Sequence, residues 1–149
     1  MPQDFEQLYA LEELCFEPPE RFSSRYIRNL VSRANAATWI AEAVGQMNGF
    51  AIVEWNQEPD EMTAYIQTIE VAPEARGRGV GRELLSRIED SARDAGACMI
   101  WLHVEAANAG AIRLYEMHGY RCEGRQENYY PRGRAVLIYV KRLDSERAN

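Results

Sequence analysis

A stretch of alternating arginine and glycine, RGRGVG at residues 76–81, separates two segments of different periodicity. Residues 62–71 alternate between apolar and polar and are rich in β-forming side chains, which predicts a strand. From Val80 onward apolar residues recur every three or four positions, which predicts an amphipathic helix. Glycines let the backbone approach an anion closely, and a helix N-terminus offers unpaired N–H groups and the positive end of the helix dipole. The chain is therefore predicted to form a strand, loop and helix unit whose loop binds a pyrophosphate.

The spacing of this loop narrows the choice of ligand. A Walker loop needs a Lys-Ser or Lys-Thr pair after its last glycine, and none follows here. A dinucleotide fingerprint needs a third glycine at a position occupied by Arg82 or Leu84. The pattern that remains is R-x-x-G-x-G, which disfavours ATP, GTP, NAD and FAD. A flexible solvated turn is the alternative interpretation of the same residues.

Length and composition predict one domain over residues 1–149. The chain is 46% hydrophobic and 27% charged, which is typical of a soluble globular protein. No apolar run approaches the ~20 residues that span a bilayer, and the N-terminus lacks the pattern of a secretory signal. We therefore expect a cytoplasmic protein that does not bind a membrane. The net charge of −6 argues against nucleic acid as a partner and is compatible with a cationic amine.

Cysteine and histidine do not form a metal-binding pattern. Cys15, Cys98 and Cys122 are odd in number and lack C-x-x-C spacing. His103 and His118 are the two histidines, and neither belongs to an H-E-x-x-H sequence. We therefore predict neither a metal site nor a disulfide framework.

Periodicity and turn residues predict the element order ααβββαβαββ. The expected helices are 4–15, 24–32, 80–95 and 108–118, and the expected strands are 37–44, 49–55, 62–71, 98–105, 120–127 and 135–142. The Asn48-Gly49 pair predicts the tight turn of a hairpin between the first two strands. Residues 128–133 are predicted to be a loop between the last two. This order predicts a mixed sheet with helices on both faces.

A second motif adds specificity to the glycine loop. Residues Asn108 to Tyr120 fit the pattern N-x-x-A-x-x-L-Y-x-x-x-G-Y. Together with R-x-x-G-x-G at the observed spacing, this resembles the GNAT acetyltransferases over roughly residues 49–143. Residues 127–131 (ENYYP) resemble a loop of protein N-terminal acetyltransferases, notably bacterial ribosomal-protein-alanine N-acetyltransferases. The resemblance implies an α/β GNAT-like fold, with a twisted, mostly antiparallel sheet that splays at an acetyl-CoA site.

The resemblance also implies how acetyl-CoA, the cosubstrate, would be held. The backbone of the glycine loop would bind its pyrophosphate through Arg76, Gly77, Arg78, Gly79, Val80, Gly81 and Arg82. Main-chain groups of the preceding strand would bind the pantetheine arm at Ile69, Glu70 and Val71. Asn108 and Tyr115 would contact the cosubstrate from the following helix, although helix capping alone would also explain Asn108.

Acetyl transfer from a thioester to an amine requires a base for the amine and an acid for the departing thiolate. Tyr115 suits the role of the acid, because protonating a departing thiolate requires only a weak acid such as tyrosine. His103 occupies the position where ribosomal-protein-alanine acetyltransferases carry a glutamate. Tyr65 has the spacing of a tyrosine that accompanies this histidine in some eukaryotic and archaeal-type N-terminal acetyltransferases, so Tyr65 and His103 are the leading base arrangement. Glu105 and Glu70 are alternative bases.

The acceptor is predicted from aromatic residues beside the expected site. Tyr26, Tyr129 and Tyr130 would form walls against an extended peptide, although a buried aromatic cluster is an equal interpretation. A free protein N-terminus is the favoured acceptor, and the most specific prediction is the N-terminal alanine of a ribosomal protein. The enzyme is expected to be a monomer or weak homodimer. Two alternatives stay open: acetylation of lysine or of a small-molecule amine, and a non-catalytic acetyl-CoA-binding module.

Overall fold

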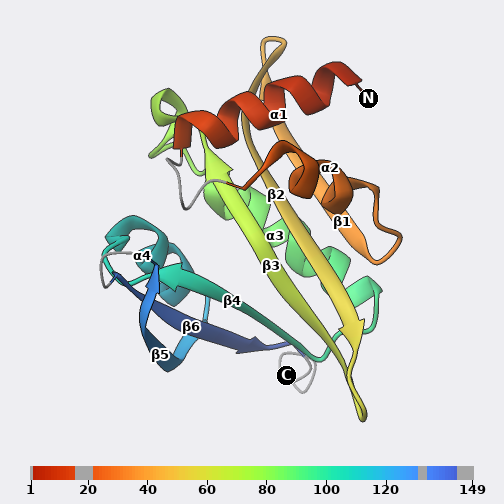
Figure 1. The fold of residues 1–149 in the computed structure, drawn as a ribbon, viewed down its shortest axis with the longest axis vertical. Coiled ribbons are helices and arrows are strands. Elements are labelled where there is room, and N and C mark those ends of the chain that lie inside the picture. Colours follow the sequence, from red (N-terminus) through yellow and green to blue (C-terminus); the bar gives the residue numbers. More distant parts are fainter. Residues whose placement is uncertain (1, 16–21, 131–133, 144–149) are drawn as a thin grey trace.

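The computed structural model describes residues 2–15, 22–130 and 134–143, and within these ranges the strands form one mixed sheet (Figure 1). In the spatial order β1-β2-β3-β4-β6-β5, the strands are β1 (Ala36–Ala43), β2 (Gln46–Gln57), β3 (Met62–Val71), β4 (Met99–Glu105), β6 (Arg134–Arg142) and β5 (Arg121–Tyr130). The helices are α1 (Pro2–Cys15), α2 (Ser24–Ser32), the 3-10 turn η1 (Pro73–Ala75), α3 (Val80–Asp94) and α4 (Ala109–Met117). Apart from the added 3-10 turn, the predicted order is confirmed.

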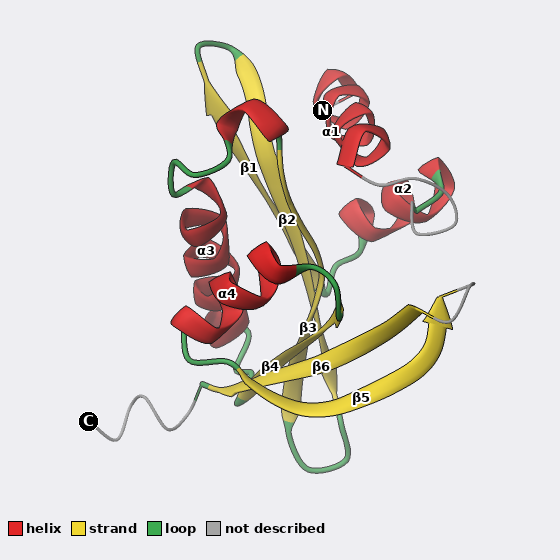
Figure 2. Cartoon of the chain, turned by 90° about the vertical axis from the view of Figure 1, so that its left-hand side faces the viewer, coloured by secondary structure: helices red, strands yellow, loops and turns green. Residues whose placement is uncertain are grey.

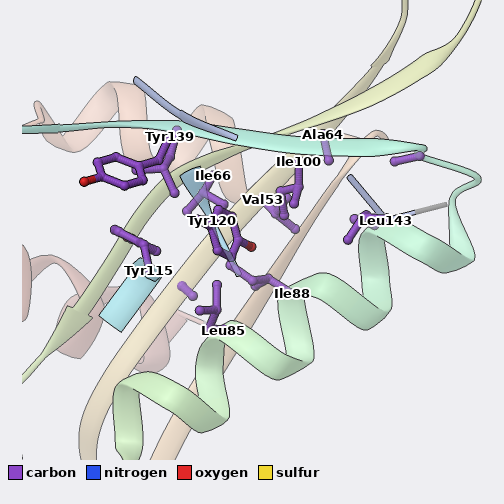
Figure 3. Close-up of a cluster of buried hydrophobic side chains, with 14 of the residues drawn as sticks. Val53, Ala64, Ile66, Leu85, Ile88, Ile100, Tyr115, Tyr120, Tyr139 and Leu143 are labelled. Atoms are coloured by element: carbon purple, nitrogen blue, oxygen red, sulfur yellow. The ribbon is translucent and has the colours of Figure 1, made fainter. Parts of the chain in front are cut away.

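The helices cover both faces of the sheet, as predicted (Figure 2). Helices α1 and α2 lie on one face, and α3 and α4 lie on the other. On this second face, Leu85 and Ile88 of α3 and Tyr115 of α4 belong to the larger buried cluster (Figure 3). Each fully buried leucine or isoleucine stabilises the fold by about 1.5–3 kcal/mol. No helix within the described ranges is long and apolar enough to cross a membrane.

The sheet consists of two antiparallel halves joined by a short parallel contact. Strands β3 and β4 pair at three positions, the last of which joins Tyr65 to Trp101. Beyond this point β3 remains paired with β2 as far as Val71, whereas β4 remains paired with β6 as far as Glu105. The two strands therefore diverge (Figure 1), and we call the region beyond Tyr65 and Trp101 the fork. The predicted splayed, mostly antiparallel sheet is confirmed.

The hairpin between β1 and β2 differs from the prediction. Its turn is Val44-Gly45, where both residues have positive φ (54° and 73°), as a type I′ turn requires. The predicted Asn48-Gly49 turn is wrong, because these residues lie inside β2 beside a break in register. A Cβ on Gly49 would lie 2.6 Å from the carbonyl oxygen of Glu70. Glycine is needed there for close packing of two strands, which local sequence does not distinguish from a turn.

Strand β5 is longer than predicted. Its backbone continues to Tyr130, which pairs with Arg134 of β6, whereas the sequence predicted a loop from residue 128. A shift in register between Gln126 and Tyr130 accommodates the extra residues. Such bulges insert residues without breaking a strand, so the polar composition of this segment did not reveal it.

A pair of buried glutamates joins α1 to β3. Glu12 and Glu70 have exposed fractions of 0% and 2%. Glu12 Oε2 accepts a hydrogen bond from the Phe22 N–H (2.8 Å), and Glu70 Oε2 accepts one from Thr68 Oγ1 (2.8 Å). The two Oε1 atoms are buried, and no N–H group or alcohol hydroxyl of the described residues donates to them, which leaves a proton on one of the two carboxyls as their donor. Burial, followed by a hydrogen bond with Glu12, raises the pKa of Glu70 to about 10, so the Glu70 carboxyl carries a proton at neutral pH.

We predict that Glu70→Gln removes a pH dependence of stability. Because the folded-state pKa of Glu70 is raised, its contribution is fully present below an unfolded pKa of 4.5 and is lost as the pH rises toward about 10. The free energy of unfolding of the wild type should therefore fall relative to that of the variant, by at most about 1.4 kcal/mol per pH unit. Urea unfolding between about pH 5 and pH 9 measures this. Glu74→Gln, at an exposed position, is the control. If the free energy of unfolding depends on pH in the same way in the wild type and in Glu70→Gln, the Glu70 carboxyl is not protonated in the folded protein.

Candidate functional site

A cleft of about 540 Å³ opens at the fork. Its walls come from both faces of the sheet: Tyr26 of α2 contributes from one face, and Asn108 and Tyr115 contribute from the α4 side. Tyr65 and His103 lie between them, on the two diverging strands. The cleft therefore gives access to the same few side chains from both faces of the sheet.

The predicted pair of Tyr65 and His103 meets in this cleft. The hydroxyl of Tyr65 lies 2.7 Å from Nδ1 of His103, within hydrogen-bond distance. Burial lowers the pKa of His103, so the imidazole is neutral at neutral pH. When Nδ1 carries the proton and donates to the tyrosine oxygen, Nε2 is left unprotonated. A neutral imidazole fixed through one nitrogen can accept a proton through the other, directly or through water.

The two carboxylates predicted as alternative bases are placed differently. Glu105 lines the cleft, and its Oε1 lies 3.5 Å from Nη1 of Arg134 in an ion pair between β4 and β6. Glu70 points toward Glu12 of α1, and its raised pKa of about 10 leaves it protonated at neutral pH. A protonated carboxyl does not accept a proton from an amine. The geometry thus favours His103 over Glu70 for proton abstraction.

Tyr115 reaches the cleft from α4. Its ring is buried against Tyr120, with 5.5 Å between the ring centroids, and burial raises the pKa of its hydroxyl. The hydroxyl is therefore held in its neutral, proton-carrying form. Asn108 is the N-cap of α4, and its Oδ1 accepts a hydrogen bond from the Ala111 N–H (3.1 Å). Capping thus engages the Asn108 side-chain oxygen and sets where α4 begins.

The glycine loop leads directly into the N-terminus of α3. Gly77 and Gly79 have φ values of 80° and 84°, a conformation that favours glycine. Gly79 is the N-cap and provides no side-chain hydrogen bond, and the first helical bond runs from the Glu83 N–H to the Gly79 carbonyl. The N–H groups of Val80, Gly81 and Arg82 precede that bond. This is an N-terminus shaped to hold an anion through its backbone.

The arginines of this loop divide into two kinds. Arg76 Nε donates a hydrogen bond to the Val71 carbonyl (3.1 Å), and its Nη2 lies 3.6 Å from Cys15 Sγ. Its side chain thus fastens the loop to the end of β3. Arg78 and Arg82 are exposed. Arg76 is exposed as well, so all three loop arginines present charge to solvent, and Arg76 differs in being bonded to β3.

The edge of β3 beyond the fork suits an extended ligand arm. Ile69, Glu70 and Val71 pair with β2, and the pairing of β3 with β4 ends at Tyr65. A strand edge without a neighbouring strand can exchange hydrogen bonds with an extended chain laid beside it. This edge leads to η1 and the glycine loop. Together they form a continuous backbone surface, and its exposed edge and helix N-terminus fit a ligand with an extended arm and a pyrophosphate, such as acetyl-CoA.

The predicted acceptor residues are described only in part. The Tyr26 hydroxyl donates a hydrogen bond to Gln67 Oε1 (3.1 Å), and Gln67 Nε2 donates one to Glu54 Oε1 (2.6 Å). Tyr26 therefore faces the cleft in a fixed position. Tyr129 and Tyr130 belong to β5, and their side chains lie outside the described part of the structure.

Sequence reasoning missed two cleft residues. Trp101 shares a strand face with His103, and strand alternation alone could have indicated it. Gln67 lies at a break in the register between β2 and β3, which no local pattern reveals. Among the described residues, no cluster of three or more potential ligands could hold a metal ion.

Comparison with known proteins gives several matches. Residues 5–120 match the model of the acetyltransferase (GNAT) family. Streptothricin acetyltransferase of Streptomyces lavendulae is 41% identical over 88 residues, which cover 58% of this chain and 46% of that protein. The ribosomal protein bS18-alanine N-acetyltransferase of Escherichia coli K12 is 39% identical over 87 residues, which cover 58% of this chain and 56% of that protein. The aligned segments span about half the length of each relative.

A solved structure extends the likeness to nearly the whole chain. The crystal structure of the ribosomal-protein-S18-alanine N-acetyltransferase from Escherichia coli has a TM-score of 0.81 and 26% identity, with 96% of this chain and 90% of that chain covered. The family match includes β3, the glycine loop, α3 and α4, which build the cleft and its backbone surface. The chain therefore belongs to the GNAT family of acetyltransferases, whose acetyl donor is acetyl-CoA.

Proposed function

We propose that this protein transfers the acetyl group of acetyl-CoA to the free N-terminal α-amine of a protein or peptide. The observation that carries the proposal is the 2.7 Å contact between Tyr65 and His103 inside the cleft at the fork. This pair places a neutral base between the acceptor side and the cosubstrate side of the sheet. The most specific form of the proposal is alanine at the N-terminus of a ribosomal protein, since the Escherichia coli relative that matches in both sequence and structure carries that activity in its name.

The cosubstrate would be held mainly by backbone. The N–H groups of residues 76–82 would bind the pyrophosphate, and the main chain of Ile69, Glu70 and Val71 would bind the pantetheine arm. Exposed Arg78 and Arg82 would add positive charge beside the phosphates. Acetyl-CoA supplies the activated acetyl group and a thiolate leaving group.

The protein's own residues then handle two protons. His103 accepts the proton that the amine loses when it attacks, and the hydrogen bond to Tyr65 holds the imidazole ring in place. Tyr115 keeps its hydroxyl proton at neutral pH and can donate it in a hydrogen bond to the departing thiolate sulfur, which stabilises the charge that develops there. His103 and Tyr115 lie on different elements but line one cleft, so the attacking amine and the departing sulfur would be served by different walls of the same site.

A small-molecule amine is the second candidate acceptor. One relative is named for acetylation of streptothricin, and its aligned segment is as long as that of the protein N-terminal enzyme. The cleft opens beside Glu54, Glu58 and Glu105, which would attract any ammonium group. The two candidates therefore differ in the shape of the acceptor rather than in the chemistry.

The first test of the proposal is the choice of acceptor. We predict that mixing the protein with acetyl-CoA and an alanine-initiated octapeptide releases free thiol, whereas the same peptide with a blocked α-amine and an internal lysine releases none. The reason is that the cleft would admit a chain end and not a side chain from a continuous strand. Thiol detection and mass spectrometry of the peptides measure this. Faster reaction with the blocked peptide would support lysine, and acetyl-CoA binding with no turnover on any amine would support a binding module.

The second test is the base. We predict that His103→Ala lowers kcat/KM by about 100-fold or more, because a positioned general base contributes roughly 100- to 10,000-fold. Tyr65→Phe should lower it less, because the imidazole remains while its hydrogen bond is lost. His118→Ala is the matched control, since that ring bonds the Leu114 carbonyl at the end of α4. An unchanged rate in both His103→Ala and Tyr65→Phe would mean that another group takes the proton.

The third test is the acid. Tyr115→Phe removes one hydroxyl that bonds to no residue in the described part of the chain, so the fold should be retained. We predict a fall in kcat of about 10- to 100-fold with unchanged acetyl-CoA affinity, because only proton donation is lost. Steady-state kinetics and calorimetric titration with acetyl-CoA separate these quantities. Loss of binding in parallel with loss of rate would show that Tyr115 has a structural role.

A further inference from the structure

Trp101 occupies the last paired position before the fork. Its ring centroid lies 4.6 Å from that of Tyr65 and 5.3 Å from that of His103. The Trp101 and Tyr65 planes are tilted by 58°, and the Trp101 and His103 planes meet at 67° in the edge-on arrangement that aromatic pairs favour. The indole therefore contacts both Tyr65 and His103, the two residues proposed to act together as the general base.

Core packing does not account for this large side chain. Its strand neighbours Ile100 and Leu102 belong to the larger buried cluster, whereas Trp101 belongs to neither that cluster nor the one beneath α1 and α2. Strand alternation places it on the opposite face, where it is half-buried and lines the cleft. A tryptophan in this position contributes little to the apolar interior of the described fold.

The indole N–H is available to a ligand. It forms no hydrogen bond with a residue in the described ranges, and it is not among the buried polar atoms that lack a partner. It is therefore accessible to solvent at the wall of the cleft. A tryptophan N–H beside a peptide-binding space usually finds an acceptor when it is covered.

We propose that Trp101 is a positioning residue: its ring fixes Tyr65 and His103 relative to each other, and its N–H donates to the first carbonyl of the acceptor peptide. The second role rests on the proposed function, whereas the first does not. The ring also excludes water from one side of the imidazole. The other ionisable groups around the cleft come from every element packed against it: Glu12 of α1, Tyr26 of α2, Glu54 of β2, Glu58 of the turn after it, Glu105 of β4, Tyr115 of α4 and Arg134 of β6.

Two substitutions separate the two roles. Trp101→Leu removes the ring, so water reaches His103 and the desolvation that lowers its pKa is relieved. Trp101→Phe keeps an aromatic ring and removes the N–H. We expect the His103 pKa, read from imidazole NMR signals during a pH titration, to rise toward 6.5 in Trp101→Leu and to stay near the wild-type value in Trp101→Phe. His118 in the same spectra is the internal control.

Kinetics with the alanine-initiated octapeptide test the second role. Trp101→Phe should raise the peptide KM by about five-fold with little change in kcat, as expected for one lost hydrogen bond. Trp101→Leu should also lower kcat, and acetyl-CoA affinity should be unchanged in both. An unchanged His103 pKa in Trp101→Leu would overturn the positioning role, and an unchanged peptide KM in Trp101→Phe would overturn the donor role. If the wild type acetylates no peptide, the proposed function fails, while the NMR titration still decides the positioning role.

Discussion

The end of pairing between β3 and β4 is the constraint on which the site depends. At the last pair, Tyr65 and Trp101 are neighbours at the spacing of a normal sheet, about 4.8 Å between strands. One step further the strands part, so His103 and Tyr65 can meet through their side chains while the backbone between them is open. A fully paired sheet would close the cleft, and two separate sheets would not bring the Tyr65 hydroxyl within 2.7 Å of His103 Nδ1. The fork therefore allows both the contact between Tyr65 and His103 and the opening of the cleft.

A break in register along β3 decides which of its side chains enter the cleft. Ala64 and Ile66 lie in the cluster under α3, and simple alternation would place Glu70 on that same face. The register shifts between Ile52 and Val53 of β2 leave Gln67 without a partner, which reverses the alternation beyond it. Glu70 consequently points to Glu12 of α1. One bulge thus explains why Glu70, on a strand that lines the cleft, is buried and protonated.

Local patterns in the sequence were sufficient to predict the order of helices and strands and the position of the glycine loop. Helical periodicity and the helix start at Val80 are encoded within a few residues. The contact of Tyr65 with His103 depends on the parallel register of two distant strands, and only resemblance to a family could indicate it. The turn at Val44-Gly45, the bulge at Gln67 and the extent of β5 were missed for one reason. Each depends on how strands align across the sheet, which a single strand's composition does not specify.

Under the proposed function, the two substrates would be held by different kinds of atoms. The surface proposed for acetyl-CoA consists largely of backbone at the edge of β3 and the start of α3, so most side-chain changes there would leave it intact. The proposed acceptor side of the cleft is built from side-chain hydrogen bonds, in which Arg33 and Gln67 both donate to the carboxylate of Glu54, at 2.8 and 2.6 Å. Gln67 in turn accepts a hydrogen bond from Tyr26, so this series of bonds fixes α2 over the cleft. Because these contacts do not involve the glycine loop, the proposed function implies that the choice of amine could change while acetyl-CoA binding is preserved.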